Sequence, residues 1–267
     1  MRGLHSLDGT LVESVPPEFA LCPYGVFTTF VLVDGSVLGW RDHIARLAHD
    51  ARTLWGHELD ETGVNEALYG HAATLTAPST VRITLYPNEI SITWPQRAHG
   101  CRILVSSRTT EFPFVPESGF TVGTAEFQRD LPTVKSTGLL GQIRLRRDAQ
   151  LAGHDDVLFR RGSEVLEGAT WAVVVWRKGE VITPAGPVLP SITAKHLAGI
   201  AEALGWKFRA GRIGIEDLAH AELVQAASAN HPARSIASVD GQPINQNGDL
   251  LQDLAREYST LSMQATR

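Results

Sequence analysis

Apolar residues follow two different periods in the first third of the chain. Residues 27–33 are β-branched and aromatic and are closed by Asp34-Gly35, which is typical of a strand followed by a turn. In residues 40–54 the apolar positions recur every three or four residues, which predicts an amphipathic helix. The residues on its apolar face are Ile44, Leu47, Ala48 and Ala51.

The rest of this region continues the alternation of strands and helices. A second helix is expected near residues 61–75, and residues 103–105 read as a strand. Residues 81–85 and 90–94 alternate strictly between apolar and polar positions, with Pro87-Asn88 between them. This pattern predicts a short β-hairpin. The first hundred residues therefore predict a small α+β domain.

A proline-rich stretch separates this region from the remainder. Residues 112–118 show no periodicity, and prolines interrupt them, so we expect a linker there. The boundaries predict two domains, residues 1–111 and 119–267. In the second domain we expect strands at 120–125, 156–159, 171–176 and 181–183, and helices at 140–152, 192–204 and 249–261.

Composition narrows the class of protein. The chain has 267 residues, 43% hydrophobic and 20% charged, which is ordinary for a globular protein in water. A net charge of −5 argues against a general nucleic-acid binder. We expect no membrane span and no signal peptide, because no apolar run is long enough.

Cys22 and Cys101 lack CxxC spacing and read as small apolar residues of a cytoplasmic protein. The ten histidines show no ligand spacing, so no metal is expected.

One lysine and one glutamate carry the candidate chemistry. Lys135 ends an apolar run that we interpret as a strand, and Glu167 follows in 165–170. Partial burial disfavours an ammonium ion and leaves a nucleophilic amine, which can form a Schiff base with an aldehyde. An acid can hold a pyridinium nitrogen protonated, as pyridoxal phosphate chemistry requires. A strand-end lysine and a surface glutamate with no such role would fit these residues equally well.

Four stretches of the sequence resemble one family. They are 26–29 with Asp34-Gly35, 40–47, 134–140, and 166–168 through 189–193. Their order and spacing are similar to those of the class IV aminotransferases, the fold-type IV pyridoxal phosphate enzymes. That family includes branched-chain aminotransferases, D-amino acid aminotransferases and aminodeoxychorismate lyases. The resemblance implies an α+β fold with a small α/β N-terminal domain and a larger, β-barrel-like C-terminal domain with flanking helices. It also implies a homodimer.

The resemblance assigns the cofactor site residue by residue. It implies that Lys135 forms an aldimine with pyridoxal 5'-phosphate and that Glu167 binds the ring nitrogen. Ile192 and Thr193 would bind the phosphate at a helix N-terminus, where unpaired amides favour an anion. An ordinary N-cap by Ser191 explains the same local sequence. Ser228 is aligned loosely with a second phosphate-binding turn.

Arg46 matches the phosphate arginine of the family. Arg41 and Arg52 lie close to it in the sequence and have the same chemistry, so only the position of Arg46 within residues 43–47 singles it out. Arg129, six residues before Lys135, could bind a carboxylate or brace the strand, and we favour the brace.

The substrate side departs from the family pattern. Thr29, expected to be catalytic, and Phe27 resemble the lyase motif, although a strand threonine is as good an explanation for Thr29. Leu140, which with Phe27 is expected in the substrate pocket, stands where branched-chain enzymes carry tyrosine and where the lyases and D-amino acid enzymes carry leucine. Trp171 adds bulk to the expected substrate pocket, and Ala172 replaces an asparagine. The short hairpin at 86–89 leaves no room for the arginine and histidine that trap the substrate carboxylate in some D-amino acid enzymes.

Three functions stay open at this point. The first is a transaminase that exchanges an amino group between a small-molecule donor and acceptor through the lysine aldimine. The second uses the same site as an aminodeoxychorismate lyase, which eliminates pyruvate to give 4-aminobenzoate. The third is a catalytically silent binding protein, which the joint presence of Lys135, Glu167, Arg46 and Thr193 disfavours.

Overall fold

The computed structural model describes residues 3–17, 19, 23–261 and 263–265, so Cys22 lies outside the described residues. The chain divides into two compact units. Unit 1 contains residues 1–111, 134–138 and 262–267, and unit 2 contains residues 112–133 and 139–261. The prediction that the chain consists of two domains joined by a linker at 112–118 stays a prediction.

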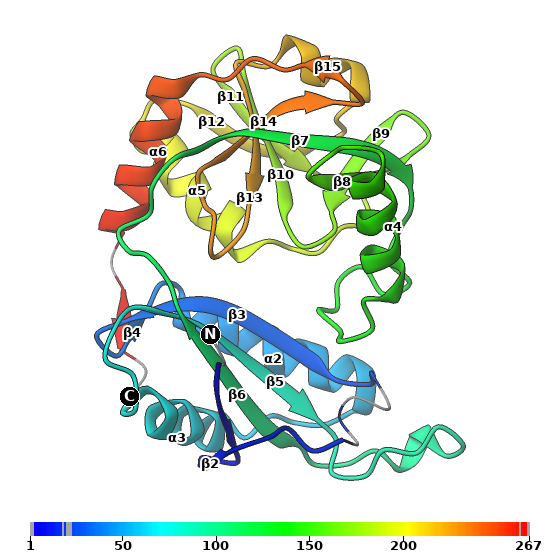
Figure 1. Ribbon diagram of the computed structural model, residues 1–267, viewed down its shortest axis with the longest axis vertical. Helices are drawn as coiled ribbons and strands as arrows, with labels where there is room; N and C mark the ends of the chain where they lie inside the picture. Colours follow the sequence, from blue (N-terminus) through cyan, green and yellow to red (C-terminus); the bar gives the residue numbers. More distant parts are fainter. Residues whose placement is uncertain (1–2, 18, 20–22, 262, 266–267) are drawn as a thin grey trace. The chain divides into compact units, whose positions relative to one another are not determined.

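Unit 1 is built on a seven-stranded antiparallel sheet with the order β16-β4-β3-β5-β6-β1-β2 (Figure 1). Its central strands are β3 (Val26–Val33), β5 (Ser79–Tyr86) and β6 (Arg102–Thr109). The shorter strands are β1 (Leu4–Leu7), β2 (Thr10–Val12), β4 (Ser36–Val37) and β16 (Gln264–Ala265).

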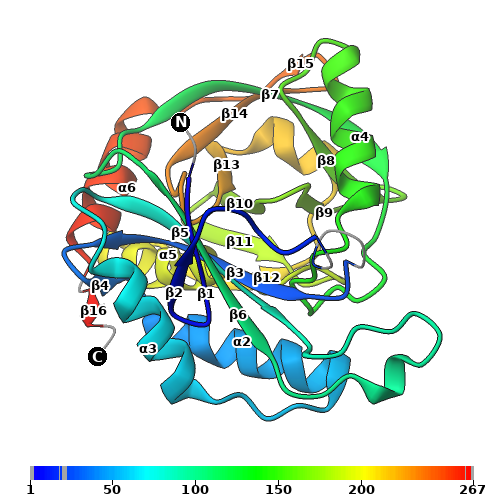
Figure 2. The ribbon, with the colours of Figure 1, turned by 60° about the horizontal axis from the view of Figure 1, so that its bottom comes forward.

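Two helices, α2 (Trp40–Trp55) and α3 (Glu61–Ala72), cover one face of this sheet (Figure 2). The predicted apolar face of α2 is confirmed, since Ile44, Leu47 and Ala51 are buried. Gly39 and Gly56 flank the helix with φ of 67° and 65°, a left-handed conformation that favours glycine. The position of α2 matters because it carries Arg46.

Unit 2 is built on a curled, mixed sheet with the order β12-β11-β10-β13-β14-β7-β8-β9. Its first strands are β7 (Glu117–Glu126), β8 (Asp156–Arg161), β9 (Glu164–Gly168), β10 (Ala172–Arg177) and β11 (Glu180–Pro184). Its later strands are β12 (Lys207–Gly211), β13 (Leu223–Ala227), β14 (Arg234–Val239) and β15 (Gln242–Pro243), which pairs with β14. This is the α+β architecture that the family resemblance implies.

Three α-helices flank this sheet, namely α4 (Leu140–Leu151), α5 (Ile192–Ala203) and α6 (Gly248–Thr260). Helix α4 lies against β8, and α5 and α6 lie against each other (Figure 1). All three predicted helices of this region are confirmed to within one residue at each end. The described residues also form two short 3-10 helices, Pro95–Arg97 in unit 1 and Ile215–His220 in unit 2.

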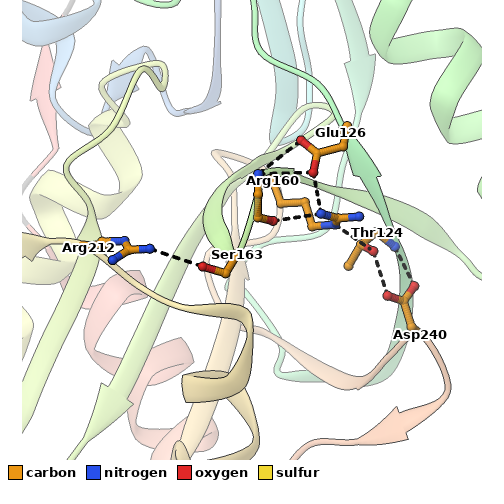
Figure 3. Close-up of polar contacts among 7 residues, drawn as sticks. Thr124, Glu126, Arg160, Ser163, Arg212 and Asp240 are labelled. Atoms are coloured by element: carbon orange, nitrogen blue, oxygen red, sulfur yellow. Dashed lines mark hydrogen bonds and ion pairs between the residues drawn. The ribbon is translucent and has the colours of Figure 1, made fainter.

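Polar pairs connect the neighbouring strands β14, β7 and β8 of unit 2 (Figure 3). The Thr124 amide and hydroxyl both donate to Asp240, each at 2.7 Å, and thereby join β7 to the turn after β14. Arg160 of β8 pairs with Glu126 of β7, its neighbour in the parallel register. These contacts are mostly exposed, so each adds little to stability.

One predicted hairpin is wrong. Residues 90–94 form no strand, and β5 pairs instead with β6, which begins at Arg102. The alternation at 90–94 does not bury an apolar face, because Ile92 is 83% exposed and Trp94 is 50% exposed. In the part of the chain that the structure describes, no helix is long and apolar enough to cross a membrane.

Candidate active site

Lys135 lies on an irregular segment that is held against the start of β3. The Phe27 amide donates to the Lys135 carbonyl at 2.9 Å, and the Thr137 amide donates to the Gly25 carbonyl at 2.8 Å. Ser136 forms one isolated bridge with Val26. The expectation of a strand ending at Lys135 is therefore wrong. The apolar residue before it, Val134, is buried in the core of unit 1 and anchors the segment there.

The Lys135 side chain is half-buried beside an aromatic ring and a second cation. Its Nζ lies 4.8 Å from the Phe27 ring centroid, and the Arg82 guanidinium carbon lies 3.6 Å from the same centroid. Burial lowers the pKa of Arg82. In the antiparallel register Arg82 stands opposite Thr29, which is half-buried. Arg82 was missed in the sequence, where an arginine on an alternating strand reads as a solvent-facing residue.

Arg46 differs from its neighbours on α2 in its surroundings. Arg46 is half-buried, whereas Arg41 and Arg52 are exposed. Arg52 is paired with Glu58 at 2.5 Å. The positive charge of Arg46 acts on the buried carboxyl group of Asp50, one turn further along the helix. The structure thus distinguishes three arginines that the sequence could not tell apart by chemistry.

Glu167 is a buried acid near the end of β9 and is 6% exposed. Its Oε1 accepts a hydrogen bond from Nε of Arg129 at 2.9 Å, and its Oε2 accepts one from the Leu189 amide at 3.4 Å. Arg129 is itself 6% exposed, so the pair is an internal salt bridge. The prediction that Arg129 braces a strand before Lys135 is wrong, because residues 127–133 form no strand; Arg129 instead holds the carboxylate of Glu167.

A cavity of about 260 Å³ opens beside Glu167 within unit 2. Its walls are mostly apolar and come from β9, β10, β11, the 188–191 loop, α5 and β12. Ala172, Leu189, Ser191 and Lys195 are among the lining residues. The cavity therefore joins a buried carboxylate to the first turn of a helix.

The N-terminus of α5 begins at this cavity. Ser191 is the N-cap, and its hydroxyl accepts from the Ala194 amide at 3.1 Å, so the N-cap interpretation of Ser191 is confirmed. The amides of Ile192 and Thr193 come first in the helix, where no intrahelical acceptor exists. Thr193 is buried, and its hydroxyl is hydrogen-bonded to Tyr258 of α6. Burial raises the pKa of Tyr258 to about 12, which keeps the phenol protonated.

The remaining predicted residues lie in varied surroundings. Ser228 follows β13 and exchanges two backbone hydrogen bonds with His231, each 3.1 Å long. Leu140 is the first residue of α4 and is 82% exposed. Trp171 is 6% exposed, and its indole donates to Asp156 at 2.9 Å. Ala172, rather than Trp171, is among the residues that line the cavity. The pocket roles of Leu140 and Trp171 stay predictions.

Space for Trp171 depends on the residue three positions before it. A Cβ placed on Gly168 would lie 1.9 Å from the Trp171 ring, so a side chain cannot be accommodated there without displacing the indole. The bulk of Trp171 packs in the core of unit 2, against Phe120 among others. Burying a tryptophan requires a partner for its N–H, which Asp156 provides.

The segment after β5 is a loop of residues 87–101 and not a tight hairpin. It carries Arg97 and His99, so the prediction that no arginine and histidine could be accommodated here is wrong. The Arg97 guanidinium lies 5.2 Å from the Trp94 ring centroid, and Nδ1 of His99 is 2.8 Å from the Arg97 carbonyl. Elsewhere, the described residues contain no group of three or more His, Cys, Asp or Glu side chains arranged to hold a metal ion.

Comparison with known proteins identifies a family. The family model described as amino-transferase class IV matches residues 25–239 of this chain. A probable branched-chain-amino-acid aminotransferase of Staphylococcus epidermidis is 37% identical over 79 residues, which cover 28% of this chain and 22% of that protein. This local match therefore spans about a fifth of the curated relative.

Solved structures share the fold over nearly the whole chain. A branched-chain aminotransferase from Thermoproteus uzoniensis, crystallised with norvaline, superimposes with a TM-score of 0.81 at 22% identity, covering 96% of this chain and 93% of that one. A PLP-bound hypothetical aminotransferase from Mycobacterium tuberculosis gives 0.80 at 18% identity, covering 96% and 99%. A fold IV-transaminase from Curtobacterium pusillum gives 0.79 at 22% identity, covering 97% of each chain.

Proposed function

Because this chain belongs to the class IV aminotransferase family, we propose that it is a pyridoxal phosphate-dependent aminotransferase acting on an amino acid. The observation that carries this proposal is the cavity of unit 2, which has a buried carboxylate at one side and a helix N-terminus at another. A buried carboxylate can bind a cationic ring nitrogen, and a helix N-terminus can bind a phosphate. Pyridoxal phosphate has both.

The residues present fit this cofactor. Lys135 would hold it covalently through the ε-amine, and Glu167 would bind the ring nitrogen. The amides of Ile192 and Thr193, the Thr193 hydroxyl and Arg46 would bind the phosphate, with Ser228 in a second turn. The mycobacterial relative contains PLP, which supports the same cofactor here.

Each of these side chains then has a defined task. The bound cofactor supplies an electron sink that stabilises negative charge on the substrate carbon. Glu167, charge-paired with Arg129, would keep the ring nitrogen protonated. The ε-amine of Lys135 would act as the base that takes the proton from the substrate α-carbon and as the acid that later returns it. Thr29 would lie on the substrate side.

Arg82 supports an amino acid rather than a simple amine as the substrate. Its guanidinium stacks on Phe27, the ring that Lys135 also approaches, and no described carboxylate pairs with it. Arg82 is half-buried, and its Nε donates to the neutral Thr84 hydroxyl at 3.2 Å, so a substrate carboxylate would add the compensating charge. Arg97 and His99, on the 87–101 loop, are a second candidate for the same task.

The lyase remains the second candidate because Phe27-Thr28-Thr29 resembles the lyase motif. Absorbance titration of the purified protein separates the two reactions. An amine donor that shifts the visible band and yields a keto acid identifies a transaminase, and a panel of L- and D-amino acids gives the stereochemistry. Formation of 4-aminobenzoate and pyruvate from aminodeoxychorismate identifies the lyase. A protein that takes up no pyridoxal phosphate contradicts both.

A further inference from the structure

Asp50 is a buried acid whose hydrogen bonds are incomplete. It lies on α2 and is 0% exposed. Its Oδ2 accepts a hydrogen bond from the main-chain amide of Lys135 at 3.0 Å. Its Oδ1 has no hydrogen-bond partner among the described residues. An acid in such a position is costly unless nearby groups compensate it.

The compensation comes from cations on two segments. The pKa of Asp50 is raised, because burial outweighs the opposing effects of the Lys135 amide and of the nearby Arg46, His49 and Lys135, which favour the carboxylate. Arg46 and Asp50 are four residues apart on α2 and therefore share a face of the helix. The carboxyl group of Asp50 thus acts on the lysine and on the arginine that the proposed function assigns to one cofactor.

The main chain of Lys135 is held from both sides. Its carbonyl accepts from the Phe27 amide of β3 at 2.9 Å, and its amide donates to Asp50 of α2 at 3.0 Å. The segment is also held by the Ser136 bridge to Val26 and by the hydrogen bonds of Thr137 to Gly25. Without Asp50 the amide side of this peptide would lose its protein acceptor.

We propose that Asp50 is the positioning residue of Lys135: its buried carboxyl group fixes the lysine main chain to helix α2, and its negative charge acts on the lysine amine. This inference rests on the proposed role of Lys135. A carboxylate near an ammonium group favours the charged form and so restrains the amine from reacting before its proton is removed. The same charge balances Arg46.

The hydrogen bond between the Lys135 amide and the Asp50 carboxyl group can be tested without any substitution. Hydrogen–deuterium exchange on the full, cofactor-free chain should show the Lys135 amide exchanging at least about tenfold more slowly than an unprotected peptide amide. Exchange at the unprotected rate would overturn the proposal. Asp50→Ala should remove the protection, whereas Asp50→Asn should retain most of it, because the amide oxygen of asparagine can still accept.

The effect of the Asp50 charge on the Lys135 amine is tested by acylation of lysines with acetic anhydride at pH 7.5, followed by peptide mapping. The sequence has four lysines, namely Lys135, Lys178, Lys195 and Lys207, so each rate can be read separately. In Asp50→Asn the acylation of Lys135 should become about threefold faster or more, since a neutral side chain no longer favours the ammonium form. The exposed Lys178 and Lys207 should keep their rates.

Asp60→Asn is the matched control. Asp60 is an exposed acid of unit 1 that caps α3, and asparagine is an equally good N-cap. This variant removes one charge and should leave Lys135 acylation unchanged. A Lys135 rate in Asp50→Asn equal to that of wild type, or an equal rise in Asp60→Asn, would contradict the proposal.

The outcomes separate this inference from the proposed function. Both measurements use the cofactor-free chain, so they do not depend on catalysis. If wild-type protein forms no borohydride-stable bond to pyridoxal phosphate at Lys135, the proposed function fails whatever Asp50 does. If that bond forms and Asp50→Asn does not alter Lys135, only the role of Asp50 fails.

Discussion

Arg129 donates to Glu167 across 2.9 Å, and only 6% and 8% of their side-chain surfaces are exposed. A buried acid that is paired with an arginine has a fixed orientation. Its second oxygen accepts a longer hydrogen bond from the Leu189 amide, at 3.4 Å. The proposed function has this oriented carboxylate also bind the pyridine nitrogen.

Glu167→Gln should retain covalent cofactor binding but lose turnover by a factor of about 100 or more, equivalent to roughly 2.7 kcal/mol. A neutral amide cannot keep the ring nitrogen protonated, so the α-proton becomes harder to remove. Steady-state rates with the best substrate, together with the visible spectrum, measure this. Turnover at the wild-type rate would remove Glu167 from the ring nitrogen.

Arg46→Ala should weaken cofactor binding by about 2–5 kcal/mol, because an arginine–phosphate pair is charge-assisted and bidentate. Arg41→Ala and Arg52→Ala are the matched controls and should each cost roughly 0.5 kcal/mol or less, since both residues are exposed. Fluorescence titration of the cofactor-free variants gives the three affinities. Three equal values would exclude Arg46 from the phosphate site.

Arg82→Gln should raise KM for an amino acid substrate about tenfold or more and leave cofactor binding unchanged, because it removes the proposed carboxylate partner. For a substrate amine without a carboxylate group, the same variant should behave as wild type. Kinetics with a matched pair, an amino acid and its decarboxylated amine, make this comparison. An equal loss with both substrates would mean that Arg82 acts through packing on Phe27.

Tyr258→Phe should weaken phosphate binding modestly, by about 1 kcal/mol, because it removes the hydrogen bond to the Thr193 hydroxyl. Since the phenol stays protonated up to a pH of about 12, wild-type affinity should show no step caused by Tyr258 between pH 7 and pH 10. Phosphate competition against pyridoxal phosphate measures both effects. An unchanged affinity would show that Thr193 does not need this partner.

The sequence predicted most of the helices and central strands because their apolar residues follow a clear period. Helix α2 and strand β3 are examples in which local pattern and tertiary burial agree. Prediction from the sequence failed at residues 90–94, where apolar and polar positions alternate without burial. It also failed at Lys135, because contacts with β3 and α2 determine the conformation of its segment. The short strand β16 depends on a distant partner, β4, and leaves no local signal.

The candidate site was predictable only as far as the family motif extends. Lys135, Glu167, Arg46 and Thr193 were placed by motif, whereas their supporting groups were not. Asp50 could have been noticed as a polar residue on the apolar face of α2, three positions after Leu47. Arg82 and Tyr258 gave no such signal, because one is on an alternating strand and the other is on an ordinary amphipathic helix.

We also expect a homodimer, as the family resemblance implies. Sedimentation at micromolar concentration should give about twice the mass of one 29.0 kDa chain. A monomer with full activity would contradict this expectation.

The most direct test of the central claim is borohydride reduction of the protein loaded with pyridoxal phosphate, followed by peptide mapping. The proposed function predicts that a visible absorption band disappears and that the phosphopyridoxyl label is found on Lys135, with none on Lys178, Lys195 or Lys207. Lys135→Ala should give no covalent label while the cofactor can still bind noncovalently. A protein that takes up no cofactor, or one labelled on another lysine, would contradict the account.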